Sequence, residues 1–145
     1  MFQHILIVCT GNICRSPVAA ALLARALPER RVESAGLGAV VGHGVEPTAR
    51  RLGEADGLDL ADHQARQLTA GMLHAADLVL VMSEGQRRAA GELAPEALGK
   101  TMRLGRWLEN GQGRDIPDPY RKSPEAFEHV HQLLKDATHS WATRL

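Results

Sequence analysis

The sequence predicts an α/β fold: a single three-layer domain in which a four-stranded parallel sheet is flanked by helices. Two observations carry this prediction. Apolar, β-branched runs at 5–8 (ILIV) and within 77–82 (DLVLVM) are typical of strands buried on both faces. A helical pattern follows each run, and buried strands that alternate with helices form a parallel sheet covered on both sides.

The bulk composition indicates one globular domain, residues 1–145, with one core. Lys and Arg number 17, as do Asp and Glu, so the formal net charge is zero. That balance gives no electrostatic basis for binding nucleic acid or an anionic membrane. No apolar run approaches the roughly 20 residues of a membrane span, and the N-terminus lacks the basic region of a signal peptide. We therefore expect a cytoplasmic protein with reduced thiols, no nucleic-acid partner and no membrane insertion.

The first elements follow from local signals. The strand at 5–8 leads into a tight loop. Ser16 is then the expected N-cap of a helix, Pro17 its first residue, and the Ala/Leu-rich run 18–27 its continuation. Residues 30–36 (RRVESAG) are expected to form a second strand, which ends at a glycine-rich loop.

The later elements follow from caps and periodicity. Thr48, Thr69 and Ser123 are the expected N-caps of three helices. The predicted elements in this part of the chain are helices over 49–58, 69–74, 83–93 and from 123 onward, and strands over 77–82 and 100–105. The last helix carries apolar residues at helical spacing: Phe127, Val130, Leu133, Leu134, Ala137 and Trp141.

The loop after the first strand contains the residues with the clearest chemistry. Ligands of parallel sheets bind at the carboxyl ends of the strands, where loop N–H groups and a helix N-terminus attract anions. Cys9 lies at the base of this loop, and its thiolate is stabilised by the helix N-terminus and by Arg15. The guanidinium of Arg15 suits two phosphate oxygens, and Ser16 is placed to hydrogen-bond the sulfur. Cys-x5-Arg-Ser therefore favours attack on phosphorus with a phosphocysteine intermediate over the alternative, a structural buried cysteine.

A phosphate ester also needs an acid for its leaving oxygen. Asp115 and Asp118, in RDIPDPY, are the candidates. Pro117 and Pro119 stiffen the loop around Asp118, and apolar neighbours favour the protonated carboxyl. The residues alone leave this role and a simple Asp-Pro turn equally open.

The motif VCTGNICRSP resembles the signature of the low-molecular-weight phosphotyrosine protein phosphatases. The segments VESAGLGAVVG, ARQLT, DLVLVM and IPDPYRKS and the Trp-bearing terminal helix also resemble that family, so the resemblance covers the whole chain. It is closest to the bacterial branch that accompanies tyrosine kinases of capsule and exopolysaccharide export.

The resemblance implies residue roles. Cys9 is the implied nucleophile, Arg15 the phosphate ligand and Asp118 the acid. Ser34 and His63 resemble residues that support the phosphate-binding loop. The implied substrate-binding residues are Thr10, Gly11, Asn12, Ile13, Cys14, Ser16 and Tyr120. Neither a cofactor nor a metal ion is expected.

Two of these residues keep a second interpretation. Tyr120 either forms one wall of a slot for a flat phenol or packs the loop as a half-buried aromatic residue. Cys14 is either an inert buried thiol or, as the resemblance implies, a partner that traps oxidised Cys9 as a disulfide.

Four rival functions are less consistent with the sequence. Arsenate reductases of this fold use two further cysteines, and this chain has only two in all. Phosphoarginine hydrolases carry Thr where this chain has Ile13, whose apolar side chain suits a phenyl ring. A phosphopeptide-binding module needs neither a nucleophile nor an acid. A dinucleotide site is disfavoured by the spacing of Gly36, Gly38 and Gly42 and by Pro47.

The expected function is therefore the metal-free hydrolysis of phosphotyrosine in proteins. The resemblance implies that the partner is an autophosphorylated bacterial tyrosine kinase of exopolysaccharide or capsule production.

Overall fold

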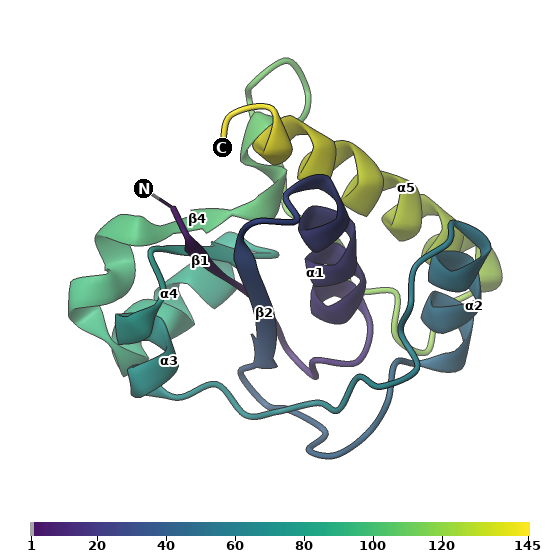
Figure 1. The fold of residues 1–145 in the computed structure, drawn as a ribbon, viewed down its shortest axis with the longest axis horizontal. Helices are drawn as coiled ribbons and strands as arrows, with labels where there is room; N and C mark the ends of the chain where they lie inside the picture. The colour runs from purple at the N-terminus through teal and green to yellow at the C-terminus, as the bar shows by residue number, and fades with distance from the viewer. Residues whose placement is uncertain (1) are drawn as a thin grey trace.

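The computed structural model describes residues 2–145, and its centre is a parallel sheet of four strands in the order β2-β1-β3-β4. Helices cover both faces of this sheet (Figure 1). This arrangement confirms the predicted three-layer α/β fold. The strands are β1 (His4–Cys9), β2 (Arg31–Gly36), β3 (Leu78–Val81) and β4 (Thr101–Arg103).

Strand β1 lies between β2 and β3, so both of its faces and both of its edges are covered. Cys9 is in register with Gly36 of β2, and Val8 is in register with Val81 of β3. The chain runs from β1 to β2 on one side and returns to β3 on the other. The carboxyl end of β1 is therefore a topological switch point, where open parallel sheets bind ligands.

The helices fall into two layers. On one face, α1, α2 and α5 pack over Ile5 and Ile7 of β1. On the other face, α3 and α4 pack over Leu6 and Val8. The helices are α1 (Arg15–Ala26), α2 (Pro47–Ala55), α3 (Ala70–Ala75), α4 (Glu84–Leu93), α5 (Pro124–Ala142) and the 3-10 turns η1 (Pro95–Lys100) and η2 (Leu104–Trp107).

Two of the predicted helix caps are confirmed. The hydroxyl of Thr69 accepts a hydrogen bond of 3.2 Å from the amide of Met72, at the start of α3. The hydroxyl of Ser123 accepts one of 3.2 Å from the amide of Ala126, at the start of α5. Both caps satisfy amides that the first turn of a helix leaves unpaired.

The other two predicted caps are wrong. Helix α1 starts at Arg15 with Cys14 at its N-cap, so Ser16 lies inside the first turn and its hydroxyl binds tertiary partners. Helix α2 is capped by Glu46 in place of Thr48. The Glu46 carboxylate accepts hydrogen bonds from the first free amides of the helix, which a threonine two residues later cannot reach.

The long helix α5 completes the layer that covers α1. The five residues Phe127, Val130, Leu134, Ala137 and Trp141 of its apolar positions are buried, and Leu133 is partly buried. The indole N–H of Trp141 donates a hydrogen bond of 2.8 Å to the carbonyl of Leu104. That bond and the turn η2 end strand β4 earlier than the predicted boundary of 105. No helix within residues 2–145 has the length and apolar character required to cross a membrane.

Candidate active site

The carbonyl groups of the loop after β1 are hydrogen-bonded, whereas its amides are free within the described residues. The carbonyls of Cys9, Thr10, Gly11 and Ile13 accept hydrogen bonds of 2.8–3.0 Å from amides of the segment 37–46. Among the described residues 2–145, none accepts a hydrogen bond from the amides of residues 10–14. These free donors lie at the positive end of α1, so the loop can hold an oxyanion.

Asn12 holds the loop in this shape from behind. It is fully buried in the left-handed conformation, with φ of 57°. Its amide nitrogen donates to the hydroxyls of Ser16 (2.8 Å) and Ser34 (3.0 Å). The backbone carbonyl of Asn12 accepts a hydrogen bond from Nε2 of His63 (2.7 Å), and its side-chain oxygen accepts one from the backbone N–H of Arg66 (2.9 Å). The two predicted support residues, Ser34 and His63, thus both contact Asn12.

Arg66 belongs to this network and was not predicted. The backbone N–H of Arg66 contacts Asn12, as described above. Its side-chain Nε donates a hydrogen bond of 2.9 Å to the carbonyl of Ser34, and its guanidinium forms an ion pair of 3.0 Å with Glu33. Burial acts to raise the pKa of Glu33, but Arg66 and Arg31, with a hydrogen bond from His4, outweigh it and lower that pKa. Arg66 lies in the segment ARQLT, where no spacing pattern singles it out.

Gln86 is a second contact that the sequence did not reveal. Its side chain donates to the hydroxyl of Thr10 at 3.1 Å and accepts from the amide of Met82 at 2.8 Å. It therefore ties the loop after β1 to the end of β3.

Cys9 lies at the base of the loop, 2% exposed, with Sγ 2.9 Å from the hydroxyl of Ser16. Because that hydroxyl oxygen already accepts a hydrogen bond from Asn12, its own hydrogen is free to point at the sulfur. A hydrogen bond of this kind stabilises a thiolate.

Arg15 and Asp118 meet at the pocket, although 103 positions separate them in the sequence. The buried guanidinium of Arg15 donates to the carbonyl of Ile116 at 2.8 Å, and its other terminal nitrogen lies 3.7 Å from the Asp118 carboxylate. The other carboxylate oxygen of Asp118 accepts a hydrogen bond of 3.0 Å from the backbone amide of Tyr120. Asp118 thus lines the same pocket as the loop after β1.

Asp115 lies elsewhere. Its carboxylate pairs with Arg103 at 3.1 Å and accepts from the amide of Glu84 at 3.2 Å. It does not line the pocket that Asp118 lines.

The pocket above Cys9 has a cavity volume of about 170 Å³. Tyr120, 42% exposed, lines it together with Val40 and Gly38 of the glycine-rich loop. The side chains of Asn12 and Ser16 are buried behind the loop, so contact with a substrate is left to their backbone amides. The predicted site residues that line the pocket are Cys9, Thr10, Gly11, Ile13, Cys14, Arg15, Asp118 and Tyr120.

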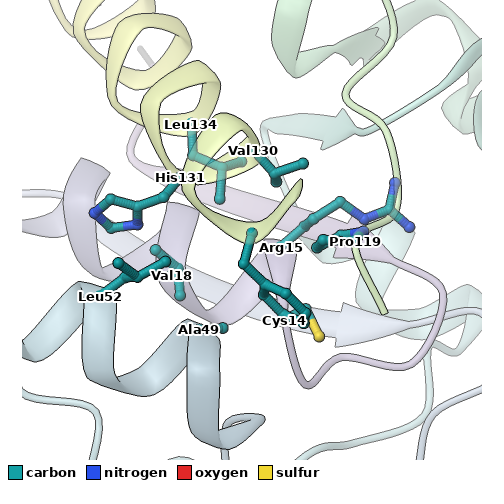
Figure 2. A pocket seen from close by; sticks show the side chains of 10 residues that line it. Cys14, Arg15, Val18, Ala49, Leu52, Pro119, Val130, His131 and Leu134 are labelled. Atoms are coloured by element: carbon teal, nitrogen blue, oxygen red, sulfur yellow. The ribbon is translucent and has the colours of Figure 1, made fainter. Parts of the chain in front are cut away.

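Cys14 is a free thiol between two cavities. One is the pocket above Cys9. The other is a small apolar pocket between α1, α2 and α5, which Val18, Leu52 and His131 help to line (Figure 2). Burial raises the pKa of Cys14 to about 12, the charges of Glu46, Cys9 and Asp118 add to the shift, and Arg15 opposes it. At neutral pH Cys14 is therefore a protonated thiol, a weak nucleophile.

Within the part of the chain that the structure describes, no group of three or more His, Cys, Asp or Glu side chains is arranged to hold a metal ion. The polar groups that face the pocket are a thiol, a guanidinium, a carboxylate and backbone amides. Together they can bind a phosphoryl group, attack it and protonate its leaving oxygen.

Comparisons with known proteins agree with this chemistry. The low molecular weight phosphotyrosine protein phosphatase family matches residues 4–145. The protein-tyrosine-phosphatase Etp of Escherichia coli K12 is 46% identical over 99% of this chain and 95% of its own length. The tyrosine phosphatase Wzb of Escherichia coli K30, solved with sulphate, has a TM-score of 0.95 at 46% identity and covers 99% of both chains.

A further solved structure is similar to the same degree. Wzb of Vibrio vulnificus, in complex with benzylphosphonate, has a TM-score of 0.95 at 43% identity, and the match covers 100% of both chains. These matches confirm the resemblance inferred from VCTGNICRSP. The chain belongs to the low molecular weight phosphotyrosine protein phosphatase family and is a protein-tyrosine phosphatase.

Proposed function

We propose that this enzyme hydrolyses phosphotyrosine in proteins through a phosphocysteine intermediate on Cys9. One observation carries the proposal. The Cys9 thiol shares a pocket with the Arg15 guanidinium and the Asp118 carboxylate, which lie 3.7 Å apart, and the adjoining loop has amides that no described residue accepts from. A nucleophile, an oxyanion site and an acid thus share one cavity.

In the first step the Cys9 thiolate attacks phosphorus opposite the phenolic oxygen. The S–P bond forms as the P–O bond to the phenol breaks. The equatorial oxygens accept hydrogen bonds from the loop amides and from Arg15, which stabilise the charge in the transition state. Asp118 gives its proton to the departing phenolate.

In the second step Asp118, now ionised, takes a proton from a water molecule that attacks the phosphocysteine. The S–P bond breaks and inorganic phosphate leaves. The hydroxyl of Ser16, 2.9 Å from Sγ, stabilises the thiolate that returns. No cofactor takes part in either step.

The shape of the pocket favours an aryl ester. Ile13 and Val40 give it apolar walls, and the Tyr120 ring supplies a flat one. The relative from Vibrio vulnificus was solved with a benzylphosphonate, a phosphate analogue that bears a phenyl ring. Phosphotyrosine has the same flat ring next to its phosphorus centre, whereas phosphoarginine presents a guanidinium to these apolar walls.

The proposed substrate is an autophosphorylated bacterial tyrosine kinase of exopolysaccharide or capsule production, and the proposed location is the cytoplasm. The partner rests on the branch of the family that the sequence resembles, and the location rests on the two free thiols, which suit a reducing compartment. The whole of residues 1–145 is proposed to act as one domain, as the family match over 4–145 supports.

The test is turnover of a phosphotyrosine peptide by the purified protein. We expect release of phosphate without added metal, none from the Cys9→Ser variant, and little from matched phosphoserine or phosphoarginine. Preferred turnover of phosphoarginine would contradict the proposal.

A capture experiment tests the proposed kinase partner. The Cys9→Ser and Asp118→Ala proteins are used to capture phosphorylated proteins from the source cell, and we expect a tyrosine kinase among them. If no tyrosine kinase is captured, the proposed partner is contradicted.

A further inference from the structure

Arg121 occupies an unusual position at the rim of the pocket. It follows Tyr120, and its guanidinium carbon lies 5.3 Å from the centroid of the Tyr120 ring. This distance is within the range of a cation–π interaction. The backbone of Arg121 is in the left-handed region, with φ of 62°, which is uncommon for a residue with a side chain. The turn therefore places the cation beside the ring that walls the pocket.

The charge of Arg121 has no counter-ion among the residues that the structure describes. Within residues 2–145 its guanidinium takes part in no ion pair and donates no side-chain hydrogen bond. The other arginines near this loop are engaged: Arg15 by Ile116 and Asp118, Arg103 by Asp115, and Arg114 by Glu109. Among the described residues that line the pocket, the acidic side chain is Asp118, which lies 3.7 Å from Arg15. Arg121 is thus exposed and free to pair with a carboxylate from outside the chain.

We propose that Arg121 is a specificity-determining residue, which favours phosphotyrosine flanked by an acidic residue. The inference rests on the proposed function, because it assumes that Tyr120 contacts the substrate phenol. Consecutive Cα atoms of a peptide are about 3.8 Å apart, so a residue next to the phosphotyrosine lies at the rim when the phenyl ring is inside. Val40 and Gly38, which also line the pocket, offer no charge.

The stacking explains why Arg121 suits this role better than its neighbour. A guanidinium held against an aromatic ring is pre-organised, so pairing with a carboxylate costs little further side-chain entropy. Lys122 carries the same charge, but no aromatic ring of the described residues holds it. Lys122 is therefore the matched control for a non-specific effect of positive charge.

The experiment compares two phosphotyrosine peptides that differ only in flanking Glu or Gln residues, with phenyl phosphate as a substrate that has no flanking residue. We expect the wild-type kcat/KM to be about threefold to fivefold higher for the Glu peptide at low ionic strength, as for one exposed ion pair. Arg121→Gln abolishes this preference and leaves phenyl phosphate unchanged. Arg121→Gly does the same without strain at the left-handed position. Lys122→Gln retains the preference.

Three results would overturn the inference. The first is a wild-type enzyme that treats the two peptides alike. The second is an equal loss for both peptides and phenyl phosphate in Arg121→Gln, which would show that Arg121 only braces the Tyr120 ring. The third is a Lys122→Gln variant that loses the preference to the same extent.

The Kd of the two phosphotyrosine peptides for the Cys9→Ser protein tests this inference separately from the proposed function. A lower Kd for the Glu peptide, dependent on Arg121, would support the inference even if the wild-type enzyme failed to hydrolyse phosphotyrosine. Hydrolysis of both peptides without any difference in Kd or kcat/KM would overturn the inference and leave the proposed function intact.

Discussion

The hydroxyl of Ser16 lies 2.9 Å from Sγ of Cys9 and accepts a hydrogen bond of 2.8 Å from Asn12 at the same time. Asn12 therefore orients the Ser16 hydrogen toward the sulfur. A hydrogen bond to a charged group contributes about 1.5–3 kcal/mol. In the proposed mechanism this bond is available each time the thiolate forms, before attack and after hydrolysis of the phosphocysteine.

The first prediction concerns Ser16→Ala. Its kcat is expected to fall by about 10-fold to 100-fold, because the leaving thiolate loses its donor. Rapid-mixing kinetics with an activated aryl phosphate measures this effect as a burst of phenol release that precedes slow turnover. An unchanged kcat would show that the hydroxyl does not assist thiolate departure.

The second prediction separates the two carboxylates of RDIPDPY. Asp118→Ala is expected to lower kcat for an ester with a poor phenol leaving group by about 100-fold or more, since the phenolate then leaves unprotonated. Asp115→Ala loses an exposed pair with Arg103 and is expected to change kcat less than twofold. A series of aryl phosphates of differing leaving-group pKa measures both. Equal losses in the two variants would contradict the assignment of Asp118 as the acid.

The third prediction concerns Gly36, where β2 passes close to the loop after β1. A Cβ at this position would lie 2.5 Å from the carbonyl oxygen of Thr10, so Gly36→Ala forces the loop to move. A large loss of kcat/KM is expected, about 100-fold for a displacement on the order of 1 Å. Gly99→Ala is the control, because it lies outside the pocket and no atom of the described residues, apart from its chain neighbours, lies within 4 Å of its added Cβ. Full activity in Gly36→Ala would contradict the prediction, because it would show that catalysis does not depend on the observed position of the loop after β1.

The fourth prediction follows from Cys14. Its pKa is raised to about 12 in the folded protein, chiefly by burial, against 9.0 for an unperturbed thiol. Above pH 9 the unfolded chain therefore releases a proton that the folded protein keeps, and stability falls as pH rises toward 12. Between pH 9 and 10 the free energy of unfolding is expected to fall by about 1 kcal/mol more than in Cys14→Ala.

Urea unfolding at the two pH values measures this difference. The Cys14→Ala variant serves as the control, because it retains every other group that titrates in this range. Parallel pH dependence in the two proteins would contradict the raised pKa of the Cys14 thiol.

The sequence predicted the sheet well, because the apolar runs that identify β1 and β3 are local signals. The anion-binding role of the loop from Cys9 to Arg15 was inferred from its place between a buried strand and a helix start, and it stays a prediction. The role of Asp118 as the acid was inferred from the family resemblance, because an Asp-Pro pair is more often part of a turn. Its closeness to Arg15 depends on the packing of elements far apart in the sequence.

The errors and omissions have the same physical origin. Ser16 has the character of a helix cap, but its hydroxyl is engaged by Cys9 and Asn12 after the loop folds back. Arg66 and Gln86 contact the loop from 54 and 76 residues away, at Asn12 and Thr10. Local propensity rules do not register such contacts, because a side chain that binds a distant partner no longer follows its local preference.

The most direct test of the mechanism is detection of the phosphoenzyme. Rapid-quench mass spectrometry of wild-type and Asp118→Ala proteins, mixed with a phosphotyrosine peptide, is expected to show one added phosphoryl group on the peptide that carries Cys9. The Cys9→Ala protein is expected to show none. Steady turnover with no phosphoryl group on Cys9 at any quench time, or with the group on another residue, would contradict the phosphocysteine mechanism.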